Sequence, residues 1–267
     1  MTMTINTNLS SMNAQRNTST SQNSLSTAMQ RLSSGLRVNS AKDDAAGLAI
    51  GNRMDAQSRG MNVAIRNAND GISLAQTADG ALATVTDALQ RMRELAVQAA
   101  NGTNGTTDRA NLDTEYQQLS TQITDIAAQT KFNGTAIIGG GAGAQTFQVG
   151  ANVGDTMTVT TTAVTTVAGG LTTAALATAA ITAIDAKLDT INTDRATYGA
   201  SMNRLAFTSS NLQIASENQS AARSRIMDAD FASETANLSR ANILQQAGNA
   251  MVAQANQLPQ QVMTLLR

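Results

Sequence analysis

The side chains that proteins use most often for chemistry are largely missing from this sequence. It has no histidine and no cysteine among its 267 residues, which excludes Ser-His-Asp and Cys-His nucleophiles, the usual zinc sites and the usual pH switch. The neighbouring carboxylates Asp43 and Asp44 could be an acid/base pair or a metal site. Adjacent residues on a helix point in different directions, so we expect them to cap a helix that begins nearby.

Two other motifs have simple structural interpretations. The glycines within 139–143 lack the Gly-Lys-Ser/Thr of a phosphate-binding loop and predict a linker. Asn-Gly-Thr occurs at Asn101, Asn104 and Asn133 and matches the acceptor pattern for glycosylation. Because Asn-Gly also favours turns, we interpret these sequences as turns. The sequence therefore predicts a protein that is not an enzyme and uses no cofactor and no metal.

Composition excludes further classes of protein. The formal net charge is −1 and aromatic residues make up 2% of the chain, so neither the charge nor the stacking platforms of a nucleic-acid binder are present. Residues 1–12 have no basic start and no apolar run of signal-peptide length. No apolar stretch reaches about 18–20 residues, so we expect no membrane insertion.

Both ends of the chain have the apolar spacing of amphipathic helices. Large apolar residues recur every three or four positions near the N-terminus and every seven positions from Leu244 onward, which places them on one stripe of each helix. Stripes at both termini indicate that the two arms pair. The predicted assembly seam consists of Leu25, Met29, Leu32, Leu244, Met251, Leu258, Val262 and Leu265.

The interior of the chain predicts three more helices, since the only proline is Pro259. They cover about 44–100, a shorter segment that ends before Phe132, and about 178–226. The fold class is thus mainly α, a long antiparallel helical bundle or coiled coil. We expect residues 1–40 and 228–267 to form paired terminal arms and residues 41–227 to form a helical-bundle domain.

The middle of the sequence differs from the helices in composition. Residues 145–149 and 156–161 alternate and are rich in β-formers, with a glycine-containing turn between them, so about 145–161 predicts a β-hairpin. We expect this small β-element at the turn of the helical hairpin. The Thr/Ala/Gly tract 162–178 has low complexity and predicts an exposed tip.

The two arms are expected to need neighbouring chains. Their large apolar residues are too few to offset the conformational entropy of ordering both arms. Contacts with other copies would supply the difference, whereas the inner helices have cleaner heptads and should fold in the monomer.

Several long segments resemble bacterial flagellin. At the ends these are LSSGLRVNSAKDDAAGLAI (32–50), SRIMDADFASE (224–234), ANQLPQ (255–260) and LLR (265–267). Between them lie QRMRELAVQ (90–98), KFNG (131–134) and FQVGAN (147–152). The segments occur in the family's order and cover both arms and all three inner helices, while the large outer domains of many flagellins are missing.

The resemblance implies an extracellular, secreted structural protein of the bacterial flagellum. In this family the arms form an inner coiled-coil layer around a channel, and subunits pass through the flagellar type III export channel and add beneath a cap. The implied function is a helical homopolymer for swimming motility. The implied partners are further copies of the chain, an export chaperone, and the cap and hook-junction proteins.

The resemblance also implies recognition by host innate immune receptors. The positions of the family that bind the flagellin-sensing Toll-like receptor match Arg91, Leu95 and Glu115. The leucines that the cytosolic flagellin sensor recognises are matched at Leu265 and Leu266, with Met263 in place of a third.

Three alternatives compete with a filament subunit. A hook–filament junction protein shares the terminal features, but the matches across 82–98 and 224–260 favour flagellin. A chemoreceptor-type signalling hairpin would have a tight helical turn in place of the predicted β-hairpin. A flagellin with a central peptidase domain would need a His-Glu-x-x-His motif, which is absent, and more residues than 139–178 provide.

Overall fold

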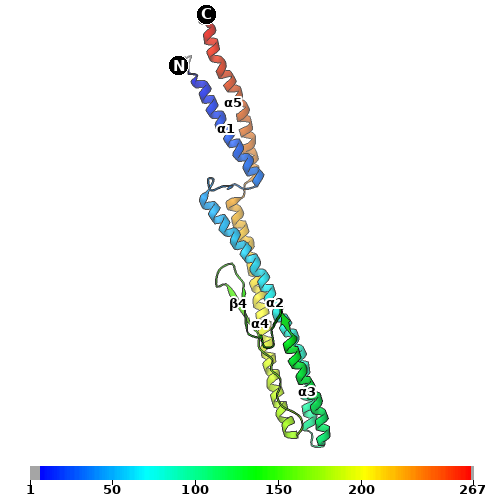
Figure 1. The fold of residues 1–267 in the computed structure, drawn as a ribbon. Coiled ribbons are helices and arrows are strands. Elements are labelled where there is room, and N and C mark those ends of the chain that lie inside the picture. The colour runs from blue at the N-terminus through cyan, green and yellow to red at the C-terminus, as the bar shows by residue number, and fades with distance from the viewer. Residues whose placement is uncertain (1–6, 266–267) are drawn as a thin grey trace. The chain divides into compact units, whose positions relative to one another are not determined.

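The computed structural model describes the backbone of residues 7–265 and the side chains of residues 7–257. Five helices dominate this part of the chain and confirm the mainly α fold: α1 (Leu9–Ser34), α2 (Ala45–Ala100), α3 (Thr106–Gln129), α4 (Ala174–Met227) and α5 (Phe231–Leu265) (Figure 1). Two antiparallel hairpins accompany them: β1 (Lys131–Phe132) with β2 (Thr135–Ala136), and β3 (Ala144–Gln148) with β4 (Thr156–Thr160).

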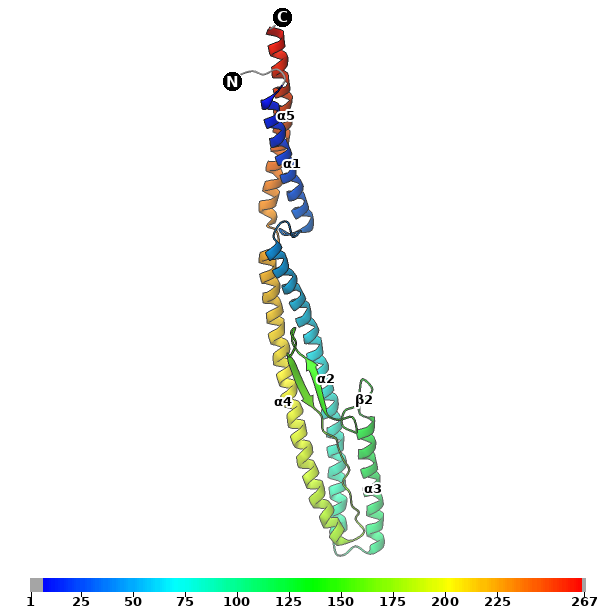
Figure 2. The same ribbon diagram turned by 60° about the vertical axis from the view of Figure 1, so that its left-hand side comes forward.

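The chain divides into two compact units. We call them the arm unit (Met1–Ala56 with Asn218–Arg267) and the central unit (Gln57–Glu217). The division falls within α2 and α4, whereas the sequence suggested boundaries near residues 40 and 228. Within the arm unit α1 and α5 lie side by side and antiparallel (Figures 1 and 2).

The ends of α1 have the residues that helix termini favour. The Asn8 side chain accepts a hydrogen bond from the Ser11 amide at 3.1 Å, which satisfies an otherwise unpaired N–H of the first turn. Gly35 ends the helix with φ 72°, and its N–H donates to the Arg31 carbonyl at 2.8 Å. Glycine adopts this left-handed conformation without a steric penalty, so it suits the end of α1.

A backbone contact holds the adjoining ends of α1 and α5 together. The Arg37 N–H donates to the Met227 carbonyl at 2.7 Å, and the Ala229 N–H donates to the Gly35 carbonyl at 2.9 Å. The Arg37 guanidinium also donates to the Ile226 carbonyl at 2.7 Å. These bonds keep the start of α5 beside the end of α1.

The predicted seam of α2 is the core of the central unit. Eight residues at steps of three and four are all nearly inaccessible: Ala75, Ala78, Leu82, Val85, Leu89, Met92, Ala96 and Ala99. From α3 the core receives Tyr116 and Ile123, and from α4 it receives Ile184, Ile191 and Leu205. The heptad spacing therefore identified the buried face of each central helix.

The predicted β-hairpin exists, but its location differs from the prediction. β3 and β4 pair with Phe147 opposite Met157. The Phe147 ring lies beside Gly71 of α2. The Gln148 carbonyl accepts a hydrogen bond from the Asn67 side chain of α2 at 2.9 Å. The hairpin thus lies against the middle of α2, not at the far turn where α2 ends at Ala100. Apolar alternation on one strand face requires a helix surface to cover it, and this surface is on the side of the bundle.

The β1–β2 hairpin was not predicted. Asn133 and Gly134 form its two-residue turn and both have positive φ, 48° and 83°. Asn-Gly is the preferred pair for this turn, so the sequence contained a hairpin signal, but the two-residue strands on either side were too short to show alternation.

None of the helices in residues 7–265 is long and apolar enough to cross a bilayer.

The tract 162–178 was predicted to be an exposed tip; most of its residues are exposed, but the tract is anchored to the helices of the central unit. Its last residues belong to α4, and residues 161–173 form a strap along the helices of the central unit (Figure 2). Val167 and Leu171 are buried. The Leu171 N–H donates to Asp113 at 2.6 Å, and the Gly169 carbonyl accepts from Gln117 at 2.9 Å. Three apolar residues at steps of three and four, starting at Val164, give the strap one buried side despite its polar composition.

An insertion between Gly169 and Gly170 is therefore expected to destabilise the central unit. It would separate the Gln117 contact from the Leu171 anchor, and loss of a buried leucine side chain costs about 2–5 kcal/mol. We expect Tm to fall by roughly 5 °C or more. The same insertion after Val153, a fully exposed residue of the β3–β4 turn, should leave Tm nearly unchanged. Equal Tm values for the two insertions, measured by calorimetry, would contradict the strap's structural role.

Candidate interaction surfaces

Small residues, with a few larger ones between them, form the contact between the two arms. On both helices the buried and half-buried positions follow steps of three and four. On α1 they are Ser11, Ala14, Thr18, Ser21, Leu25, Ala28 and Leu32, and on α5 they are Glu234, Leu238, Ala241, Gln245, Gly248, Val252 and Ala255. We call this set the arm seam. Small side chains let the helix axes approach closely, but they bury little apolar area.

The predicted assembly seam coincides with the arm seam at only two of the described positions. Leu25 and Leu32 are half-buried in it. Met29, Leu244 and Met251 are 58%, 51% and 61% exposed in the single chain, so they are not part of the arm seam, and their role in assembly stays a prediction. The side chains of Leu258, Val262 and Leu265 lie outside the described residues.

The large apolar side chains of the arms are instead left open. We call the exposed arm set Leu9, Met12, Met29, Phe231, Ile243, Leu244 and Met251, all of which are more than half exposed. Beside Leu244 a groove of about 540 Å³ runs between α1 and α5, with mostly polar walls that include Thr27 and Asn237. Leu244 and Met251 are seven residues apart on one face of α5, and exposed apolar residues that share a face can form a contact surface.

The second candidate surface is centred on Arg91 in α2. The Arg91 Nε donates to Glu115 of α3 at 2.9 Å, and its Nη1 donates to Glu94 at 2.9 Å. The bonds to Glu94, and next those to Glu115, raise the pKa of the Arg91 guanidinium above its ordinary value. The structure thus brings two of the predicted receptor residues, Arg91 and Glu115, into direct contact on an exposed surface.

Leu95, the third predicted residue, does not lie on that surface. It is 2% exposed and belongs to the core of the central unit. A side chain one helical turn after Arg91 can support the backbone beneath it, but it cannot touch a partner without leaving the core. The family resemblance identified the position and could not tell whether its side chain faces outward.

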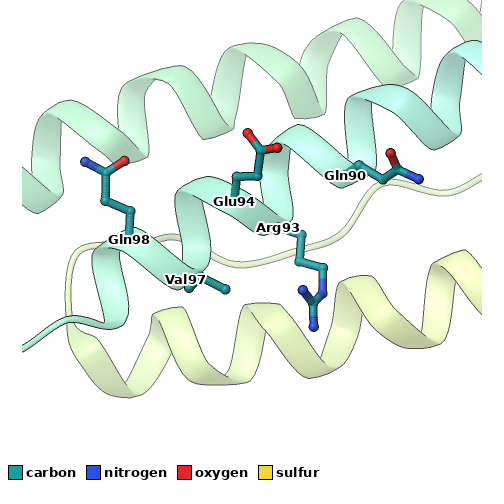
Figure 3. A pocket seen from close by; sticks show the side chains of 5 residues that line it. All are labelled: Gln90, Arg93, Glu94, Val97 and Gln98. Atoms are coloured by element: carbon teal, nitrogen blue, oxygen red, sulfur yellow. The ribbon is translucent and has the colours of Figure 1, made fainter.

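A groove beside Arg91 contains residues that sequence reasoning did not select. It measures about 510 Å³ and is lined by Gln90, Arg93, Glu94, Val97 and Gln98, all on α2 (Figure 3). Arg93 points toward α4 and donates to Asp185 at 2.6 Å, a bond that raises the pKa of Arg93. Val97 is half exposed and gives the groove an apolar patch.

The Asp43–Asp44 pair has the structural role that the sequence predicted. Asp44 accepts a hydrogen bond from the Gly47 amide at 2.7 Å, at the start of α2. Asp43 accepts from the amides of Ser40 at 2.9 Å and Asn39 at 3.1 Å. These bonds, that of Ser40 first, lower the pKa of Asp43. Within residues 7–265 no group of three or more His, Cys, Asp or Glu side chains is placed to hold a metal ion.

The lowered pKa of Asp43 predicts how this connector responds to acid. We expect carboxyl NMR to give Asp43 a pKa below the ordinary aspartate value of about 3.9. Because the folded value is the lower one, the carboxylate stabilises the connector above the unfolded pKa, and this contribution is lost as pH falls through the folded pKa. Amide protection at Asn39 and Ser40 should fall in the same range. An Asp43 pKa at or above the ordinary value would contradict the bonding.

Both halves of the sequence match described protein families. Residues 5–142 match the bacterial flagellin N-terminal helical region, and residues 181–266 match the bacterial flagellin C-terminal helical region. The two surfaces described above lie on these matched segments. The strap and the β3–β4 hairpin lie between them.

Individual relatives cover the whole chain. A flagellin of Halalkalibacterium halodurans is 48% identical over 272 positions, covering 99% of this chain and 100% of that protein. Flagellin A of Vibrio anguillarum is 36% identical over 379 positions, with both chains covered in full. That alignment is longer than this chain, so the Vibrio protein contains segments that are absent here.

A solved structure supports the fold. The crystal structure of Bacillus cereus flagellin superposes with a TM-score of 0.51 at 39% sequence identity, covering 55% of this chain and 88% of that chain. The sequence and structural similarities therefore agree.

Proposed function

Since this chain belongs to the bacterial flagellin family and is a structural subunit of the extracellular flagellar filament, we propose that it polymerises through the exposed arm set. Its role is mechanical: copies of the chain form a helical polymer that serves motility, and no bond chemistry is involved. The observation that carries the proposal is the separation of two surfaces on the arms. The arm seam takes the small residues together with Leu25, Leu32, Leu238 and Val252, and the exposed arm set remains free for neighbours.

The spacing of the exposed arm set suits contacts between helices of different copies. Leu244 and Met251 are seven residues apart, so they lie on one face of α5 and continue the spacing toward Leu258 and Leu265. Burying an exposed leucine or methionine side chain fully contributes about 1.5–3 kcal/mol. A helical lattice gives each chain several neighbours and can cover all of these side chains at once.

Hydrogen exchange on the monomer and on the filament tests this proposal. The arm seam buries little apolar area, so opening of α1 and α5 should be easy in the free chain. We expect amides of residues 9–30 and 240–257 to exchange rapidly in the monomer and to become strongly protected in the filament. Core amides of α2 near Leu89 serve as the internal control and should be protected in both states. Strong protection of both arms in the monomer would count against assembly as the source of their order.

We further propose that the Arg91 surface is the site for the host flagellin-sensing Toll-like receptor. The support is the match to the family positions together with the exposed Arg91–Glu115 contact. Arginine is common among the residues that dominate binding energies, since its planar guanidinium can make several hydrogen bonds at once. The Leu95 side chain packs in the core and supports the α2 backbone that carries Arg91. Val97 in the neighbouring groove provides an apolar contact.

Family membership suggests further partners that we retain as proposals. They are an export chaperone, the filament cap, the hook-junction proteins, and the cytosolic flagellin sensor through Leu265 and Leu266. A hook–filament junction role is the competing assignment for the whole chain. Immunogold labelling separates the two, because a filament subunit labels the full length and a junction protein labels one ring.

A further inference from the structure

The sequence of α5 leaves its alignment with α1 ambiguous. A small residue followed by asparagine recurs at intervals of seven, as Ala241-Asn242, Gly248-Asn249 and Ala255-Asn256. Residues seven apart occupy the same face of a helix in a coiled coil. Sliding α5 along α1 by seven residues, so that Asn249 takes the place of Asn256, would put Gly248 where Ala255 lies and Ala241 where Gly248 lies.

Two polar contacts in the observed alignment do not remove this ambiguity. The Ser11 hydroxyl donates to Asn256 Oδ1 at 2.7 Å, and the Asn8 side chain donates to the Ala255 carbonyl at 2.8 Å. After a slip of seven residues Asn249 would stand opposite Ser11, and another backbone carbonyl would face Asn8. Both bonds could then form again.

Gly248 lies opposite Thr18, where the methyl group of an alanine would be too close to the Thr18 side chain. A Cβ on residue 248 would lie 2.6 Å from Thr18 Oγ1 and 3.5 Å from Thr18 Cβ. The Thr18 hydroxyl donates to the Ala14 carbonyl at 2.9 Å, and its branched side chain has few other rotamers. A slip in one direction brings Ala241 opposite Thr18, and a slip in the other brings Ala255. Either alanine methyl would clash where Gly248 has none.

Glu234 marks the alignment at the other end of the seam. It is 8% exposed and is the only charged residue that is buried among those whose side chains are described. Its carboxylate lies 4.0 Å from the Arg31 guanidinium. Arg31 is in the last turn of α1 and Glu234 is in the first turn of α5, so each charge also suits its helix dipole. A slip would leave the buried carboxylate without its cation, which is strongly unfavourable.

We infer that Thr18 against Gly248 and Arg31 against Glu234 set the register along the two arms, in addition to the backbone bonds between residues 35–37 and 227–229 that join their adjoining ends. This inference rests on the proposed function, because a single register places the exposed arm set of every copy identically for assembly. The gap that Gly248 leaves for Thr18, and the pairing of the buried Glu234 carboxylate with the half-buried Arg31, supply the specificity that the repeated small residues lack. The four residues are thus register determinants, not contacts with neighbouring copies.

Engineered disulfides can read the register, because the natural chain has no cysteine. The pair Ser11→Cys with Asn256→Cys reports the observed register, and Ser11→Cys with Asn249→Cys reports the slipped one. A slip of seven residues moves the partner by about 10 Å, beyond the reach of a disulfide. Each pair is oxidised in assembled filaments, and non-reducing gels separate intrachain from interchain bonds.

The decisive variant moves the glycine that faces Thr18 by one seven-residue repeat. Ala241→Gly with Gly248→Ala keeps the composition and puts the glycine where the slipped register needs it. In the parent chain the observed-register disulfide should exceed the slipped one at least tenfold. We expect this ratio to fall at least threefold in the glycine-shifted variant and in Glu234→Gln. Combining the glycine shift with Glu234→Gln should make the slipped disulfide predominate.

The outcomes separate this inference from the proposed function. A parent chain without register preference, or an unchanged ratio in the combined variant, overturns it. If the combined variant does not polymerise, the same disulfides are compared in its soluble full chain, and a tenfold preference for the observed register there overturns the inference equally. Failure of the proposed function appears differently, as parent chains that do not polymerise through the exposed arm set.

Discussion

Leu244→Asp is expected to abolish filament growth from purified chains. In the single chain the Leu244 side chain is half exposed, so the aspartate stays hydrated and the fold is kept. In the proposed assembly contact the same position is buried against a neighbouring copy. Burying a carboxylate without a partner costs several kcal/mol per subunit, and each added subunit meets this cost again. Seeded polymerisation followed by light scattering should fall to the level of the unseeded control.

A matched variant separates the position from the charge. Gln246→Glu adds one negative charge on α5 about 200° around the helix from Leu244, and it should polymerise at close to the parent rate. Circular dichroism of both variants should equal that of the parent. Normal filaments from Leu244→Asp would remove Leu244 from the assembly surface, and a loss of helix in its monomer would assign the defect to folding.

Arg91→Ala is expected to reduce receptor signalling by monomers about thirtyfold or more. An interface arginine at the centre of a contact typically contributes 2 kcal/mol or more, and about 1.4 kcal/mol corresponds to a tenfold change in affinity. The substitution also leaves Glu94 and Glu115 without their shared cation. The measurement is the concentration of monomer that gives half-maximal output in receptor-expressing reporter cells.

Arg66→Ala provides the control for charge. Arg66 lies on α2 in the central unit and is exposed, so it removes the same charge away from the proposed site. Its signalling should match the parent within about twofold. Leu95→Ala should lower signalling together with Tm, because its side chain supports the core. Equal potency of Arg91→Ala and the parent would refute the assignment.

The sequence determined the helices and the core of the central unit. Apolar residues of α2 alternate steps of three and four from Ala75 to Ala99, and such spacing has only one helical interpretation. The β-hairpin at about 145–161 followed from strand alternation and a short turn. These features depend on neighbours in the sequence, so local periodicity was sufficient to predict them.

Where the hairpin and the strap lie was decided by tertiary structure. The strap has the composition of an exposed loop, yet Leu171 is buried because the Asp113 and Gln117 side chains of α3 hold the backbone around it. A few apolar residues in a polar tract become buried only when an apolar helix surface lies beside them, and the sequence does not show where that surface is. Likewise Leu95 has the spacing of a core residue and the position of a receptor residue, and only the packed helices distinguish these roles.

The arms show the same division most clearly. The sequence places two stripes side by side on α5, one of small residues such as Gly248 and one of large residues such as Leu244. Hydrophobicity favours the large stripe as the seam within the chain, but Leu244 is half exposed in the single chain. Close packing favours the small stripe, because only there can Thr18 fit against α5. Both stripes repeat every seven residues, so periodicity alone cannot rank them; the distance of closest approach between two helices decides, and it exists only in the folded pair.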